Sequence, residues 1–352
     1  MTETVARKAE PRPADFLTVL SVTASLAVVF LHANGIFWQF DAAGTQWFSA
    51  NIIECVFYFA VPVFFMISGA NLIDYRERYS TREYCLKRFR KTVVPLLAWT
   101  ALGTLYRIAI REIPLSSVTV GFLVKGFFSN SLVNVYWFFF PLFCVYACIP
   151  LLSAVEKEKR VPVFSGLAVV CFAVNCLIPF LINVTGLPVT WPFSVSVGSG
   201  YLLHVLIGYL LTKKTPPRPL CAAIWVLALL GLALHAVGTY RLSMAAGKIV
   251  STYKGYYSVP CVLYSTGVFL GGKQLAPRLL RFRPVSRAFT VLGQYTFSFY
   301  LIHWYILHTL ALTGLPTESL AYRLLIPFPV CLLCAGIAFL LRKIPVVRHI
   351  VP

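Results

Sequence analysis

The chain has 352 residues, of which 59% are hydrophobic and only 12% are charged, and its formal net charge is +19. This balance excludes an intrinsically disordered chain and is unusual for a soluble domain. No Walker loop, dinucleotide-binding fingerprint, H-E-x-x-H or G-x-S-x-G motif occurs, so no soluble enzyme class with such a signature is indicated. The basic residues are split among short segments rather than gathered in one domain, which argues against a nucleic-acid partner.

Apolar stretches long enough to cross a bilayer as helices recur along the whole chain. Ten spans are predicted, at 16–36, 51–73, 92–110, 135–153, 161–184, 199–212, 219–240, 256–272, 289–312 and 322–341. The span at 199–212 is short. The segment 117–128 is too short and too polar-edged to cross, and we expect a re-entrant or interfacial part of an outer loop there. The first span resembles a signal peptide in position, but it has no clear small-residue cleavage site and nine spans follow, so a retained helix is expected.

The distribution of Lys and Arg predicts the orientation in the membrane. With the N-terminus in the cytoplasm, 24 of these residues fall on the cytoplasmic side, including Arg7, Lys8 and Arg12 in the N-terminal tail, and 7 fall outside. An even number of spans with both ends inside fits this asymmetry. The prediction is therefore an all-α, polytopic protein of the inner (plasma) membrane. It has a single domain over 1–352, with cytoplasmic tails at 1–15 and 342–352.

Most of the ten cysteines lie inside predicted spans, where they are interpreted as small buried apolar residues rather than a disulfide framework. These are Cys144, Cys148, Cys171, Cys176, Cys331 and Cys334. No cysteine pair has metal-ligand spacing with a histidine, so no metal site is predicted.

A histidine stands close to the outer end of the first span, in VVFLHANG (28–35). Ser21, Ser25 and His32 share one face of this helix because their spacing is four and then seven residues. A polar stripe on a membrane helix is expected to face the bundle interior or a cavity. His32 is either an idle histidine at the level of the lipid headgroups or a general base, since imidazole titrates near neutral pH.

Glu54 lies at a depth similar to that of His32, one turn inside the outer end of the second span. A pairing with His32 would fix the imidazole tautomer and raise its basicity, which is the usual role of an orienting carboxylate. The alternatives are a Glu54 side chain that faces water and a pairing of His32 with Asp41 in the outer hairpin.

Four further polar or aromatic residues are candidates for binding a substrate near the outer side. His204 and His303 lie in the outer halves of the sixth and ninth spans, and each is alternatively a hydrogen-bonded interior histidine. Tyr136 and Trp137 open the fourth span, and they are either interfacial aromatics or a platform on which a sugar ring stacks.

A strongly basic edge follows the second span, in DYRERYSTREYCLKRFRKTVVP (74–95). Arg88, Arg90 and Lys91 lie where the third span leaves the cytoplasm, and Arg88 and Lys91 share a helical face. The positive-inside rule explains part of this charge. The functional alternative is an anionic cytosolic ligand with phosphates, since Arg binds phosphate in a bidentate manner and Lys binds it as a point charge.

The order of these motifs resembles that of the acyltransferase-three family, the integral-membrane O-acyltransferases of bacteria. The matching segments are the histidine late in the first span, VPVFFMISGANL (61–72), RFRKTVVP (88–95), VYWFFFPLFCVYACIPLL (135–152) and YTFSFYLIHWYIL (295–307). The resemblance implies transfer of an acyl group, usually acetyl, from cytoplasmic acyl-CoA to a hydroxyl of a glycan or lipid-linked precursor. It implies acyl-CoA as co-substrate and no permanently bound cofactor. His32 would be the catalytic histidine, and Arg88 and Lys91 would hold the donor's phosphates.

The sequence departs from the family pattern at three positively charged positions. Ser21 stands where the family usually has Arg, Lys91 replaces the second Arg of the basic motif, and Tyr58 replaces an Arg found in closer relatives. We expect neutral groups such as Ser21, Ser25 and the tyrosines to line the donor tunnel. The Ser68-Gly69 pair is interpreted as a site of close packing or a bend, not as a nucleophile.

The rival interpretation is a carrier or flippase that moves a polar solute or a lipid-linked glycan without chemistry, and the absent arginines favour it. The sequence leaves open the acceptor, the acyl chain and the oligomeric state. Membrane lipids, acyl-CoA and the acceptor are the expected partners.

Overall fold

The computed structural model describes residues 14–43 and 45–351, and every regular element in these ranges is a helix. The basic tail residues Arg7, Lys8 and Arg12 lie outside them. The α-helices are α1 (Phe16–Ala33), α2 (Thr45–Phe57), α3 (Ala60–Leu72), α4 (Thr81–Arg88), α5 (Val94–Ala109), α6 (Val120–Phe128), α7 (Phe139–Ser153), α8 (Lys157–Phe172), α9 (Ile178–Thr185), α10 (Leu202–Lys213), α11 (Arg218–Ala246), α12 (Val259–Leu279), α13 (Arg283–Leu292), α14 (Thr296–Leu312), α15 (Leu320–Leu325) and α16 (Pro327–Leu341).

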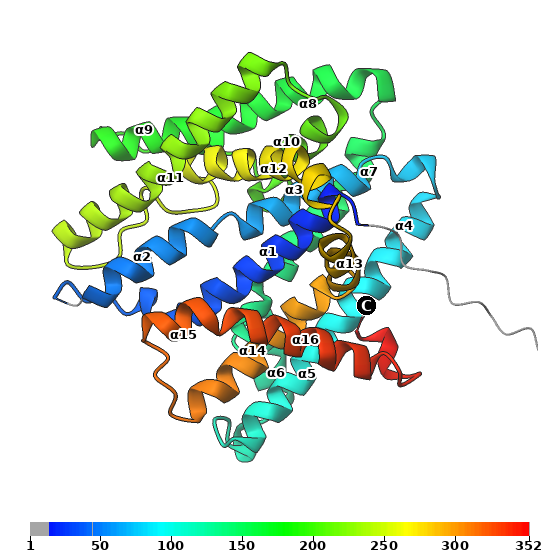
Figure 1. Ribbon diagram of the computed structural model, residues 1–352, viewed down its shortest axis with the longest axis vertical. Helices are drawn as coiled ribbons and strands as arrows, with labels where there is room; N and C mark the ends of the chain where they lie inside the picture. Colours follow the sequence, from blue (N-terminus) through cyan, green and yellow to red (C-terminus); the bar gives the residue numbers. More distant parts are fainter. Residues whose placement is uncertain (1–13, 44, 352) are drawn as a thin grey trace, which may run out of the picture.

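Helix α1 lies in the middle of the bundle (Figure 1). It contacts α2, α3, α12, α13, α14, α15 and α16. Asp15 caps its first turn by accepting a hydrogen bond from the Thr18 amide at 2.7 Å. The residues of α1 can therefore reach a space enclosed by several other helices.

The predicted all-helical membrane architecture is confirmed, and each of the ten predicted spans contains a helix. Six helical stretches of the described chain are long and apolar enough to cross a membrane: Phe16–Ala33, Gln46–Glu77, Thr81–Ala109, Asn134–Ser153, Lys157–Thr185 and Arg218–Ala246. Leu202–Lys213 and Pro327–Leu341 are shorter apolar helices. Ten crossings and two cytoplasmic ends remain predictions. The predicted start of the span at 289–312 is wrong, because a separate helix, α13, ends at Leu292.

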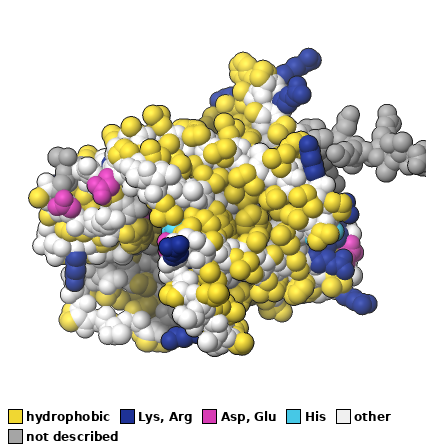
Figure 2. Space-filling view, turned by 90° about the horizontal axis from the view of Figure 1, so that it is seen from below, with side chains coloured by type: hydrophobic (Ala, Val, Ile, Leu, Met, Phe, Trp, Pro, Cys, Tyr) yellow, Lys and Arg dark blue, Asp and Glu magenta, His cyan; other side chains and the backbone are white. Residues whose placement is uncertain are grey.

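The surface is consistent with a lipid environment. Figure 2 shows a face whose middle is largely hydrophobic, with many of its Lys and Arg side chains toward the right-hand edge of the view. On α11 and α16, Val226, Leu229 and Leu332 are more than 60% exposed. Apolar patches of this extent are uncommon on soluble monomers and mark contact with lipid or a partner.

Two long helices contain a π-turn just before a proline. Between α4 and α5 the π-turn covers Phe89–Val93, and the Val94 amide donates to the Phe89 carbonyl. Between α8 and α9 it covers Ala173–Leu177. In each case a proline is the second residue of the following helix, where it lacks an amide proton and would clash with the carbonyl four residues earlier. The π-turn widens the helix at that point and lets the chain continue without a break.

Helices α3 and α10 cross at backbone contact. A Cβ atom on Gly69 would lie 1.9 Å from the Val205 carbonyl oxygen, and a Cβ on Gly208 would lie 2.0 Å from the Met66 carbonyl oxygen. Ser68 directs its hydroxyl to the Phe64 carbonyl at 2.9 Å within its own helix. The interpretation of Ser68-Gly69 as a close-packing site is confirmed.

We expect Gly69→Ala and Gly208→Ala each to destabilise the protein by about 1–3 kcal/mol or more, because the two backbones must separate. Gly166→Ala and Gly336→Ala are matched controls, since no atom lies within 4 Å of a Cβ at either position. Thermal unfolding in detergent, followed by tryptophan fluorescence, measures the difference. Equal melting temperatures for the two pairs would contradict the close crossing.

Candidate functional site

A cavity of about 740 Å³ runs through the bundle beside α1. Helix α1 contributes Ser21 and His32 to its wall, which are eleven residues and therefore about 16 Å apart along the helix axis. The α2–α3 stretch contributes residues from Glu54 to Leu72, which covers about 27 Å. The cavity thus extends along most of the length of α1 and of the α2–α3 stretch.

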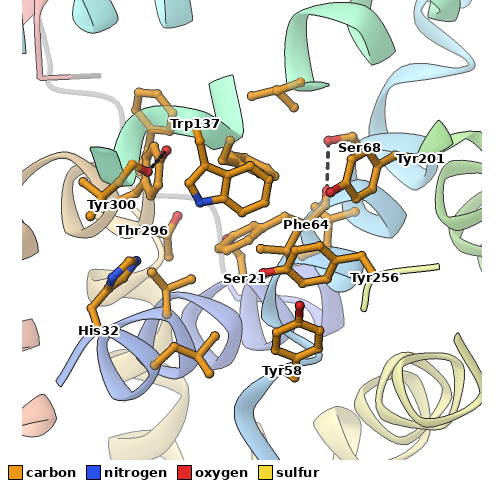
Figure 3. Close-up of a pocket in the computed structure, with 18 of the residues that line it drawn as sticks. Ser21, His32, Tyr58, Phe64, Ser68, Trp137, Tyr201, Tyr256, Thr296 and Tyr300 are labelled. Carbon is orange, nitrogen blue, oxygen red and sulfur yellow. Dashed lines mark hydrogen bonds between the residues drawn. The ribbon is translucent and has the colours of Figure 1, made fainter. Parts of the chain in front are cut away.

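His32 faces this cavity with its side chain accessible, although α1 lies in the middle of the bundle. Figure 3 shows its ring and the Trp137 indole directed toward the same space, beside Thr296 and Tyr300 of α14. The prediction that the polar stripe of α1 faces a cavity therefore holds for Ser21 and His32. It does not hold for Ser25, which is buried and donates to the Ser21 carbonyl at 2.8 Å and to the Thr296 carbonyl at 3.3 Å.

His303 lies directly behind His32, with the two ring centroids 4.9 Å apart. It is fully buried, and its Nδ1 is 2.8 Å from the Phe299 carbonyl oxygen. A carbonyl accepts only, so Nδ1 carries the proton, and Nε2 is left with a lone pair. That Nε2 has no hydrogen-bond partner among the described residues. His303, a predicted substrate-binding residue, does not line the cavity and lies beside the imidazole of His32.

Glu54 lines the cavity, but its ionic partner is Lys254 and not His32. The Lys254 Nζ lies 3.1 Å from Glu54 Oε1, and both side chains are only 3% exposed. The predicted pairing with His32 is not formed because this buried ammonium takes the carboxylate instead. Asp41, the alternative partner, is exposed and accepts from the Ala43 amide at 2.9 Å.

Aromatic rings enclose the Lys254 ammonium. Its Nζ lies 4.1 Å from the ring centroid of Tyr58, 4.5 Å from Trp38 and 4.9 Å from Phe37. These distances are those of cation–π contacts. A positive charge thus reaches the Tyr58 ring from the connection between α11 and α12.

An aromatic ladder forms another part of the wall. Tyr58 stacks on Tyr256 with ring centroids 4.5 Å apart, and Tyr256 stacks on Trp137 at 5.7 Å. All three side chains line the cavity, as Figure 3 shows. Trp137, one of the two residues predicted as a platform for a sugar ring, therefore lies in the cavity wall. Its neighbour Tyr136 is buried outside the cavity and donates to the Leu301 carbonyl at 2.8 Å, so it holds α14 against η5 (Asn134–Phe138).

His204 is also removed from the cavity wall. Its Nε2 lies 2.9 Å from the Tyr256 carbonyl oxygen, and the side chain is 1% exposed. His204 therefore holds the segment that carries Tyr256. Of the two alternatives given for His204, it fits the one of a hydrogen-bonded interior histidine.

At the other end of the cavity, Arg88 is the basic residue of the wall. Its guanidinium carbon lies 5.6 Å from the ring centroid of Tyr146 and 5.9 Å from that of Tyr84. Arg90 and Lys91 are exposed and do not line the cavity. The π-turn at Phe89–Val93 begins directly after Arg88 and contains Lys91, so the angular spacing of these two residues differs from that in a regular α-helix.

Two cations, Lys254 and Arg323, are buried near this end of the bundle. No sequence pattern distinguishes either of them from an exposed basic residue. Arg323 donates to Asn34 Oδ1 at 3.2 Å and to Ser49 Oγ at 2.8 Å, which fixes the end of α1 just beyond His32.

The sequence matches the family model described as "Acyltransferase domain" over residues 15–342. Comparison with curated proteins and with solved structures finds no match. The match covers α1 to α16 completely, together with the cavity and all the residues that line it. The chain therefore belongs to the acyltransferase-three family and is an integral membrane acyltransferase.

Proposed function

We propose that this protein transfers an acyl group, most simply acetyl, from cytoplasmic acyl-CoA to a hydroxyl of a cell-envelope glycan or lipid-linked precursor at the inner membrane. The observation that carries the proposal is one continuous cavity with Arg88 at one end and the accessible imidazole of His32 toward the other. The phosphates of the donor dock at Arg88, and the thioester arm extends along Ser21 toward His32.

His32 acts as the general base of the transfer. One ring nitrogen accepts the proton of the acceptor hydroxyl while its oxygen attacks the thioester carbonyl. The carbon–sulfur bond then breaks, and the imidazolium returns the proton to the leaving thiolate. General acid–base catalysis of this kind contributes typically about 10²- to 10⁴-fold to the rate.

His303 is a positioning residue for this base. The Phe299 carbonyl holds the proton of His303 on Nδ1, which leaves a buried lone pair on Nε2 beside the His32 ring. A modest rotation of His32 lets it donate an N–H to this lone pair and leaves its other nitrogen free to accept a proton. An imidazole replaces the carboxylate that usually orients such a base.

The oxyanion that forms at the carbonyl has no buried arginine beside Ser21 to stabilise it. Neutral hydrogen-bond donors on the cavity wall take this role, and the Trp137 indole and the Tyr58 and Tyr256 hydroxyls are the candidates. Glu54 contributes at the acceptor end, because its Oε2 has no hydrogen-bond partner within the described part of the chain and can accept from an acceptor hydroxyl.

A carrier or flippase is the second candidate function, and the length of the cavity is the observation that favours it. The release of free thiol from acyl-CoA by purified protein distinguishes the two, since a carrier leaves the thioester intact.

We expect His32→Ala to lower the transfer of labelled acetyl from acetyl-CoA to a cell-envelope extract by about 10²-fold or more. His303→Ala should lower the turnover number and change its pH profile, whereas His303→Gln, which keeps a hydrogen-bonding group, should recover part of the rate. Thermal melting controls for folding. Near-normal transfer by a folded His32→Ala protein would remove this residue from the mechanism.

Arg88→Gln should raise the apparent KM for acetyl-CoA by about tenfold, because a charge-assisted contact with phosphate is lost. Arg90→Gln is the matched control, since Arg90 is exposed and does not line the cavity. Donor titrations at two salt concentrations provide the measurement. Equal KM values for the two variants would show that the basic edge serves only membrane topology.

Lys254→Met should destabilise the protein by about 3–5 kcal/mol, because the Glu54 carboxylate stays buried without its partner. The double variant Glu54→Gln/Lys254→Met should recover most of that stability. Glu54→Gln alone should raise the apparent KM for the acceptor and leave that for acetyl-CoA unchanged. A change confined to the donor KM would contradict the placement of Glu54 at the acceptor end.

A further inference from the structure

Helix α13 is too short to cross a membrane and presents two different faces. Its ten residues span about 15 Å. One face is attached to the start of α1, since Thr290 Oγ1 accepts from the Ala14 amide at 3.1 Å and Gly293 lies against Thr18. Arg283, Arg287 and other residues of the opposite face are exposed. A short amphipathic helix with arginines on its free face is typical of a membrane interface.

A groove of about 660 Å³ lies between this free face and α16. Arg283 and Arg287, one helical turn apart, line its charged end. Ala288, Val291 and Leu332 line its apolar end, and Leu332 is 64% exposed. The groove therefore changes from cationic to apolar along the direction of α13.

No carboxylate of the described chain neutralises the two arginines. Neither forms a salt bridge, although salt bridges occur elsewhere in the described residues. Glu318 is the only acidic residue after position 158. Asp15, on the helix against which α13 packs, is occupied in capping α1 through Thr18. The positive charge of the groove is thus available for an anionic ligand.

We propose that this groove binds an anionic phospholipid. Its phosphate is held by Arg283 and Arg287, and one acyl chain lies over Val291 and Leu332. Arginine binds phosphate oxygens in a bidentate manner, and each basic residue near an anionic membrane surface adds to the attraction. A free phosphate or nucleotide would leave the apolar end of the groove uncovered. The bound lipid joins α13 to α16 and so steadies the first turns of α1. This proposal does not depend on the proposed transfer reaction.

The test uses the full-length protein purified in a neutral detergent. Dioleoylphosphatidylglycerol or dioleoylphosphatidylcholine is added, retained lipid is counted by native mass spectrometry, and the melting temperature is followed as lipid is titrated. We expect phosphatidylglycerol to be retained and to raise the melting temperature at concentrations about tenfold lower than phosphatidylcholine. Equal effects of the two lipids would overturn the proposal, as would equal protection by inorganic phosphate alone.

Two pairs of variants locate the site. Arg283→Gln/Arg287→Gln should remove the preference for phosphatidylglycerol. Lys214→Gln/Arg218→Gln, which removes the same charge from exposed positions outside the groove, should keep it. Leu332→Trp should fill the apolar end and weaken retention, whereas Leu333→Trp, at a 54% exposed position outside the groove, should not. Unchanged lipid preference in the arginine variant, or equal loss in both members of either pair, would refute the site.

Discussion

The cost of placing a polar group inside an apolar bundle is the constraint on which the site depends. It divides the interior polar side chains into two classes. Some are satisfied by a partner on another helix, as His204 is by the Tyr256 carbonyl and Tyr136 by the Leu301 carbonyl. Others, such as His32 and Arg88, face the cavity. The side chains that face the cavity are those that the proposed chemistry requires. The side chains with a partner on another helix hold together the helices that form the cavity wall.

The helices could be predicted from the sequence because an apolar run of bilayer length has few alternatives to a helix. The accessible position of His32 also followed from its helical face. Ser25 occupies the same stripe but turns to backbone carbonyls, which periodicity does not reveal. The partner of Glu54 could not be predicted, because Lys254 lies far along the chain in a connection whose path depends on the packing of α11 and α12. The π-turn at Phe89–Val93, which follows Arg88 and contains Lys91, is likewise a result of local backbone geometry next to Pro95.

The distribution of positive charge differs from the one that the resemblance to the family implies. Ser21 and Tyr58 stand where the resemblance implies arginines, so α1 and the junction between α2 and α3 contribute neutral groups there. A cation nevertheless contacts the Tyr58 ring, because the connection before α12 inserts Lys254 among three aromatic rings and against Glu54. The net charge of that pair is zero. At the other end of the cavity, Arg88 has no acidic residue beside it among the described residues of the wall.

The π-turn at Phe89–Val93 separates two tasks within one continuous helix. A π-turn contains one residue more than the corresponding α-helical turn, so the residues before and after it follow different rotational registers. The direction of Arg88 is therefore set independently of the face that α5 packs into the bundle. Deletion of a single residue from this turn would restore an uninterrupted α-helix and rotate Arg88 by about 100° relative to α5. The arginine would then leave the cavity wall without being substituted, and the basic segment RFRK would keep its composition but lose this geometry.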